Sequence, residues 1–133
     1  MSDGTRITRT IDTDLDAGEL WSLVADGDRW AEWMVDGADI EVDAGEHGTV
    51  VDGGESRDVR IDRVEPDRRV AFTWWPHARP DQSSTVELVV IPSPTGSRLH
   101  VTETYARARA ASNTLAWDVR AILLLARVVA AGV

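Results

Sequence analysis

Between residues 38 and 105 the sequence alternates apolar and polar side chains in six short runs, and no other feature limits the fold as strongly. The runs are ADIEVD (38–43), GTVVD (48–52), SRDVRIDRV (56–64), RRVAFTWW (68–75), STVELVVI (84–91) and SRLHVTETY (97–105). Alternation with a period of two is typical of strands that bury one face. The segments between the runs are short and contain Gly or Pro, which favour turns. Short connections join neighbouring strands in opposite directions, so we expect an antiparallel meander.

The remaining segments favour one more strand and three helices. They are TRITRTID (5–12), a strand; AGELWSLVAD (17–26) and DRWAEWM (28–34), two short helices; and a long helix from about residue 112 to residue 131. Asp14 or Asp16 is expected to cap the first helix, because a short acceptor side chain there can bind the free backbone N–H groups.

These elements predict a single α+β domain over residues 1–133. A sheet with one apolar face must lay that face on another element, and only the terminal helix is long enough to cover it. We therefore expect a curved seven-stranded antiparallel sheet wrapped around a long C-terminal helix, with two short helices between the first and second strands.

Composition excludes several classes of function. A formal net charge of −9 argues against nucleic acid as a main partner. Cysteine is absent and the histidines, at 47, 77 and 100, lie on separate segments, so we expect no metal site and no cofactor. The chain begins without the apolar run of a signal peptide, and its longest apolar run (121–133) is too short for a membrane span. We expect a cytoplasmic protein.

The adjacent residues Trp74 and Trp75 must point to opposite faces of their strand. Val70 and Phe72 share the face of Trp74, and this apolar set is expected to point inward. Trp75 is then expected on the outer face or at the rim. Trp has a large apolar area and one N–H that needs an acceptor, so it suits a core and a ligand cavity equally well.

Three stretches resemble a known family. The segment RTIDTDLDAGELWSLVADGDRWAEWM (9–34) resembles the opening of the START/SRPBCC superfamily, whose helix-grip fold is also that of the major pollen allergens. VEPDRRVAFTW (64–74) is similar to a strand pair of the branch related to the activator of Hsp90 ATPase. STVELVVIPSPTGSRLHVTETY (84–105) resembles its penultimate hairpin, and Trp117 stands where that branch often begins its last helix with Trp. The resemblance covers roughly residues 5–130.

The resemblance implies a cavity between the sheet and the long helix that holds an apolar or aromatic small molecule. The residues expected to bind such a ligand are Arg9, Trp33, Phe72, Trp74, Leu88, Val101, Glu103, Tyr105, Trp117 and Asp118. We expect a binding protein rather than an enzyme. The alternatives are an aromatase/cyclase-like enzyme, using Glu103, Asp118, Tyr105 and Arg9 for acid–base work, and a protein-interaction module resembling the Hsp90 activator.

The charged residues on apolar faces, and the width of the apolar arc on the last helix, lead to further expectations about contacts. In this fold the first and last strands are neighbours, so the inward-facing Arg9 and Glu103 are expected to pair, as a structural ion pair or as a ligand anchor. On the last helix, Arg120 and Arg127 form one narrow polar stripe, whereas Asp118 falls within the apolar arc. That arc is wider than one sheet face needs, which favours a homodimer contact.

Overall fold

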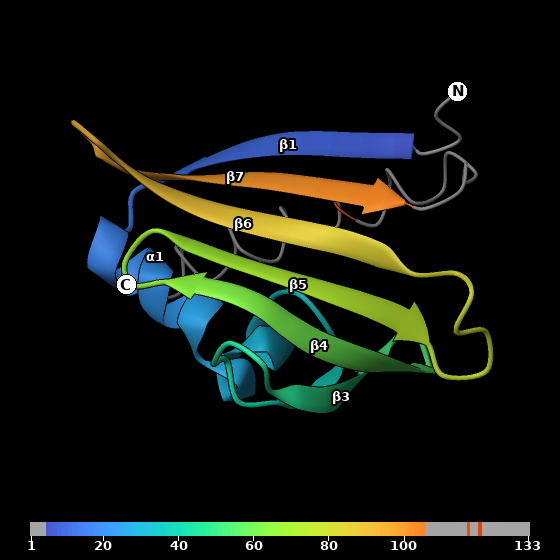
Figure 1. Ribbon diagram of the computed structural model, residues 1–133. Coiled ribbons are helices and arrows are strands. Elements are labelled where there is room, and N and C mark those ends of the chain that lie inside the picture. Colours follow the sequence, from blue (N-terminus) through green and yellow to red (C-terminus); the bar gives the residue numbers. More distant parts are fainter. Residues whose placement is uncertain (1–4, 106–116, 118–119, 121–133) are drawn as a thin grey trace.

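The computed structural model describes residues 5–105, 117 and 120, and shows a seven-stranded antiparallel sheet with two short helices (Figure 1). The elements are β1 (Thr5–Thr13), α1 (Ala17–Ala25), the 3-10 helix η1 (Gly27–Glu32), β2 (Gly37–Asp39), β3 (His47–Asp52), β4 (Glu55–Glu65), β5 (Arg69–Pro76), β6 (Ser84–Ser93) and β7 (Gly96–Tyr105). The α+β class, the seven strands and the two short helices after the first strand are confirmed. The predicted long helix over residues 112–131 lies outside the described residues, apart from residues 117 and 120.

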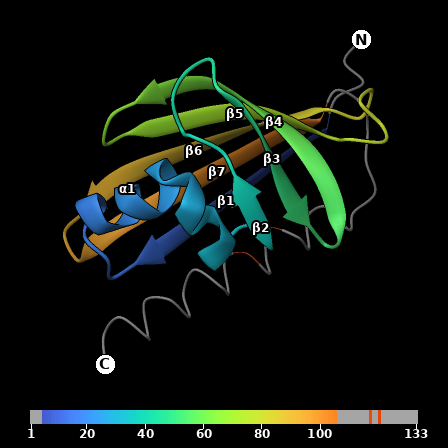
Figure 2. The same ribbon diagram turned by 90° about the horizontal axis from the view of Figure 1, so that it is seen from below.

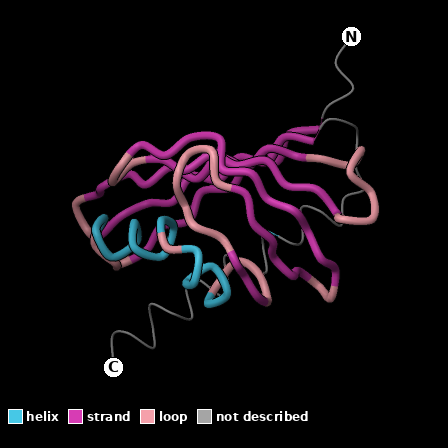
Figure 3. Tube along the Cα trace, turned by 60° about the horizontal axis from the view of Figure 1, so that its bottom comes forward, coloured by secondary structure: helices cyan, strands magenta, loops and turns pink. Residues whose placement is uncertain are grey.

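The strands lie in the order β1-β7-β6-β5-β4-β3-β2, so each strand from β2 to β7 pairs with its neighbour in sequence. The first strand closes the sheet at the other end, where Thr5 lies opposite Tyr105 and Thr13 opposite Ser97. The predicted meander and the predicted contact between the first and last strands are both confirmed. The sheet curves, and α1 and η1 lie on its concave side (Figures 2 and 3).

Helix α1 begins at Ala17 and Asp16 is its N-cap, which decides between the two candidate caps. The Asp16 carboxylate accepts a hydrogen bond of 2.8 Å from the Glu19 backbone N–H. This hydrogen bond holds the pKa of Asp16 below its usual value. Leu20, Leu23 and Val24 form the buried stripe that the helical spacing predicts.

Two elements differ from their predicted form. The second helix is a 3-10 helix that ends at Glu32, rather than a helix over 28–34, and Trp33 follows as its C-cap. The second strand stops at Asp39 instead of continuing to residue 43. After Asp39 the backbone leaves the sheet and passes close to Gly27. A Cβ atom at position 27 would lie 2.0 Å from the Ile40 carbonyl oxygen, so this close approach requires glycine.

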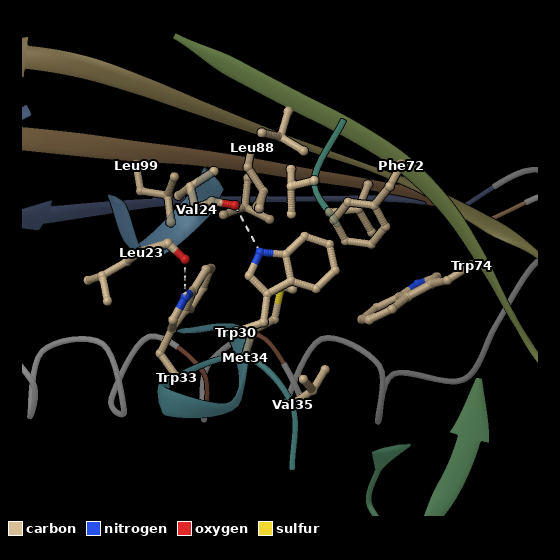
Figure 4. Close-up of a cluster of buried hydrophobic side chains, with 14 of the residues drawn as sticks. Leu23, Val24, Trp30, Trp33, Met34, Val35, Phe72, Trp74, Leu88 and Leu99 are labelled. Atoms are coloured by element: carbon tan, nitrogen blue, oxygen red, sulfur yellow. Dashed lines mark hydrogen bonds between the residues drawn. The ribbon is translucent and has the colours of Figure 1, made fainter. Parts of the chain in front are cut away.

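The core lies against the concave face and is built from aromatic rings in contact (Figure 4). The rings of Trp30 and Phe72 are 4.9 Å apart between centroids, and Phe72 meets Trp74 edge-on at 5.1 Å. The Trp30 indole donates to the Val24 carbonyl at 2.8 Å, which satisfies its one polar atom. In the described residues, no helix is long and apolar enough to cross a membrane.

Candidate functional site

The two adjacent tryptophans on β5 point to opposite faces, as their alternation predicts. Trp74 is 1% exposed and shares the concave face with the buried Val70 and Phe72. Trp75 is only half-buried, on the other face. Trp74 is therefore part of the interior, and its indole N–H must find an acceptor there.

The N–H of Trp74 is shared between the Ser84 hydroxyl and Glu103, a carboxylate that is 2% exposed on the concave face of β7. Its Oε2 accepts hydrogen bonds from Trp74 Nε1 at 2.9 Å and from Ser84 Oγ at 2.5 Å. Its Oε1 accepts from Trp117 Nε1 at 2.6 Å. The Tyr105 hydroxyl lies near enough for the charge of this carboxylate to raise the Tyr105 pKa. A buried carboxylate is tolerated when donors of this kind surround it.

Strand register explains why these donors converge. Ser84, at the start of β6, lies opposite both Trp74 on β5 and Tyr105 on β7. Glu103 lies two residues before Tyr105, on the same face. Three neighbouring strands therefore bring their polar groups to one end of the concave face.

The expected ion pair between Arg9 and Glu103 is wrong for the described residues. Ile7, rather than Arg9, lies opposite Glu103 in the β1–β7 ladder, and Arg9 lies opposite Val101. The Arg9 guanidinium donates to the Thr8 carbonyl at 2.8 Å. Glu103 is stabilised by neutral indole and hydroxyl donors instead of by this arginine.

Arg120, which helical spacing grouped with Arg127 in a polar stripe, is a buried residue in this structure, and Arg127 lies outside the described residues. Arg120 is 6% exposed and lies against the concave side of the fold. Its Nε donates to the Met34 carbonyl at 2.9 Å, and its Nη2 to Asp52 Oδ2 at 2.5 Å. The guanidinium also lies over two rings, 4.5 Å from the Trp117 centroid and 5.4 Å from the Trp74 centroid. These cation–π contacts fix the charge beside the same two indoles that bind Glu103.

We call this group the Glu103 cluster. Its members are Trp74, Ser84, Glu103, Tyr105, Trp117 and Arg120. Four of them are among the ligand-binding residues predicted from the sequence, whereas Ser84 and Arg120 are not. The inward position of Ser84 could have been read from alternation along its strand, whereas the helical spacing of Arg120 pointed the other way.

Tyr105 has a perturbed acidity within the cluster. Burial raises the pKa of its hydroxyl, and the charge of Glu103 raises it further. The positive charges of Arg120 and Arg57 act in the opposite direction but do not offset these effects. Tyr105 is therefore a hydrogen-bond donor throughout the neutral pH range.

The other predicted ligand residues lie in the apolar interior. Trp33, Phe72, Leu88 and Val101 are each at most 1% exposed, and Trp33 donates to the Leu23 carbonyl at 3.1 Å. In Figure 4, Trp30 lies between Trp33 and Trp74. These side chains are packed against one another in this structure. Asp118 lies outside the described residues.

A pocket of about 220 Å³ opens at a different place, between the end of α1 and the segment after β2. It is lined by residues 25–28 and 40–42 and shares no residue with the Glu103 cluster. In the described part of the chain, no group of three or more His, Asp or Glu side chains could hold a metal ion.

Comparison with known proteins identifies relatives of this architecture. The model of the family described as activator of Hsp90 ATPase homolog 1-like protein matches residues 14–118. That match spans the helices, all strands after β1 and Trp117. No curated protein is similar enough in sequence to count as a match.

Solved structures share the fold at low sequence identity. CalU16 from Micromonospora echinospora is 21% identical, with a TM-score of 0.72 over 91% of this chain and 73% of that one. Protein MLL2253 from Mesorhizobium loti is 20% identical, with a TM-score of 0.75 over 90% of this chain and 96% of that one. DynU16, described as a protein in the dynemicin biosynthetic locus, is 21% identical with a TM-score of 0.75. The match covers 99% of this chain but 49% of DynU16.

Proposed function

This chain belongs to the family of activator of Hsp90 ATPase homolog 1-like proteins, and we propose that it binds an apolar or aromatic small molecule. The ligand is held on the concave face of the sheet, beside Trp74 and Trp117. One observation carries the proposal: the apolar interior ends in the Glu103 cluster, where a few polar groups are held in place by hydrogen bonds. A mostly apolar lining with a few fixed polar groups is typical of small-molecule sites.

Electrostatics favours binding over acid–base catalysis. A carboxylate has about four lone-pair positions, and Glu103 accepts hydrogen bonds from Trp74, Ser84 and Trp117. A carboxylate that already accepts three hydrogen bonds in the interior is a poor general base, because these donors compete with a substrate proton for its oxygens. Tyr105 keeps its proton at neutral pH and is thus a donor rather than a base.

A cyclase-like role is the second candidate, and the observation that favours it is the likeness to DynU16, a protein of a biosynthetic locus. In that role the aromatic wall would orient the substrate, and Tyr105 would donate a hydrogen bond to a substrate oxygen. The two candidates share the same site. A binding protein releases the molecule chemically unchanged, whereas a cyclase-like enzyme converts it to a product.

Binding requires the interior to open. Trp74 and Trp117 are each 1% exposed, so a ligand has to separate side chains that are in contact. The free energy of this opening lowers the apparent affinity, because only the open fraction binds. We therefore expect saturable binding that changes tryptophan emission, since the separated indoles are the residues that the ligand meets.

Native mass spectrometry of the freshly purified protein tests the proposal directly. We expect a retained apolar molecule, and its mass identifies its class. Titration with the neutral probe N-phenyl-1-naphthylamine should quench tryptophan emission to a plateau in the native protein and in Trp75→Ala, which alters the outer face. Trp74→Ala should weaken this binding. Absence of any retained molecule, together with absence of saturable binding across a panel of apolar probes, would refute the proposal.

A further inference from the structure

Arg57 brings a second positive charge to the Glu103 cluster. On β4 it shares the concave face with the buried Val59 and Ile61. Its guanidinium carbon lies 5.0 Å from the centroid of the Trp74 ring. The side chain is 23% exposed, so Arg57 lies where the apolar interior meets solvent.

The hydrogen bonding of Arg57 is incomplete, in contrast to that of Arg120. The Nε–H group of Arg57 is buried and has no hydrogen-bond partner among the described residues. Its closest carboxylate contact joins Nη2 to Glu55 Oε1 at 3.8 Å, which is too long for a hydrogen bond. Glu55 is instead paired more closely with Arg79. A buried donor left without an acceptor is rare and costly, so its presence calls for an explanation.

The other two buried atoms of this kind are explained by each other. Arg69 Nε and Glu65 Oε2 lack ideal hydrogen-bond geometry, but they lie 3.1 Å apart as an ion pair. Arg57 Nε has no such neighbour among the described residues. An acceptor supplied by a ligand would complete it.

We propose that Arg57 selects ligands that carry a carboxylate or a similar anionic oxygen on an apolar or aromatic body. The nearby acids are already matched, because Glu103 receives three neutral donors and Asp52 pairs with Arg120. The guanidinium of Arg57 is held over the Trp74 ring and can present Nε and a terminal nitrogen as a fork to a carboxylate. This inference rests on the proposed function and adds the chemical class of the ligand.

Two matched probes separate this inference from the proposed function. Anthracene-2-carboxylate and anthracene-2-carboxamide have nearly the same shape, and at pH 7.5 only the first is charged. We expect the native protein to bind the carboxylate at least about tenfold more tightly, the size of a hydrogen bond to a charged group. In Arg57→Gln this preference should disappear, because the variant has no positive charge to pair with the carboxylate. The affinity for the uncharged carboxamide should change by no more than about twofold, which corresponds to less than 1 kcal/mol.

The control is Arg60→Gln, which removes the same charge from the opposite, exposed face of β4. It should keep the preference for the carboxylate. Arg57→Lys keeps the charge without the forked donors and should give an intermediate preference. Unchanged carboxamide binding in Arg57→Gln also shows that this variant has folded.

The other outcomes overturn either the role of Arg57 alone or the proposed function as well. If the native protein binds the carboxamide but shows no preference for the carboxylate, the role of Arg57 is refuted and the proposed function stands. The same holds if Arg57→Gln retains the preference. If the native protein binds neither probe, nor any other apolar probe, the proposed function fails and the role of Arg57 fails with it.

Discussion

At the scale of single residues, the interior satisfies its polar atoms one by one. The indoles of Trp30 and Trp33 donate to backbone carbonyls, whereas those of Trp74 and Trp117 donate to Glu103. Each buried indole therefore has an acceptor, and the buried carboxylate has enough donors to remain in the interior. The tryptophans serve as packing material and as hydrogen-bond donors at once.

Trp74 is expected to contribute far more to stability than Trp75. Trp74→Ala should cost roughly 3–5 kcal/mol, because it removes a packed ring and one donor to Glu103. Trp74→Phe should retain most of the packing and lose only the hydrogen bond, roughly 1.5–3 kcal/mol for a charged acceptor. Trp75→Ala is the control on the other face. Urea denaturation would show the order, and equal losses at the two positions would contradict it.

At the scale of elements, Arg120 joins the C-terminal part of the chain to the sheet, as Trp117 does through Glu103. It binds Asp52 at the end of β3 and the Met34 carbonyl after η1. Three segments distant in sequence are therefore joined by one side chain. The charge is buried at Arg120, whereas the Asp52 side chain is 25% exposed and retains some contact with water.

A double-mutant cycle on Arg120 and Asp52 measures this tie. Asp52→Asn leaves the buried guanidinium without its counter-charge and should be clearly destabilising, whereas adding Arg120→Met removes the unmatched charge. We expect a coupling free energy of about 1–3 kcal/mol, as found for residues in direct contact. Thermal unfolding of the four proteins gives this value. Strictly additive effects would show that the ion pair contributes nothing.

The cap of α1 gives a second prediction at this scale. Asp16→Ala should lower the unfolding temperature, and Asp14→Ala, which changes the other candidate cap, should have little effect. Because the pKa of Asp16 is lowered in the folded state, its contribution is present above the usual aspartate pKa. It is lost as the pH falls through the folded value. Comparable losses in the two variants would show that the cap contributes little.

At the scale of the whole molecule, the meander brings β1 to β7 and places the ends of β5, β6 and β7 together. The chain contains one tyrosine, and all its basic residues apart from histidine are arginines. Arginine stays charged up to a pH above about 12, so Tyr105 is the one side chain that is expected to titrate between pH 9 and 12 when the chain is unfolded. Ionisation of Tyr105 at alkaline pH can therefore be used to follow unfolding of the whole protein.

Stability should fall at alkaline pH because of Tyr105. Its pKa is raised on folding, so its contribution is fully present below the unfolded value of about 10. Above that pH the unfolded chain releases the proton first, and the free energy of unfolding decreases. Tyrosinate absorbance at 295 nm should appear together with loss of near-ultraviolet circular dichroism, and Tyr105→Phe should remove the alkaline slope. Tyrosinate formation in the folded protein near pH 10 would contradict this.

Much of this fold was predictable from local patterns. Alternation located six strands to within a few residues, and it placed Trp74 inside and Trp75 outside, because side-chain direction in a strand follows from position alone. The cap and apolar stripe of α1 were equally local. The early end of β2 was not, because it depends on the packing of residues 40–42 beside Gly27.

The polar contacts of the candidate site depended on the tertiary structure. Alternation placed Glu103 inside, but its partners Trp74 and Ser84 come from other strands, and only the register brings them within reach. Arg120 looked like part of a polar stripe because a helical pattern does not show what faces each side. A buried charge is stable only beside a matching group, and no sequence period encodes where that group lies.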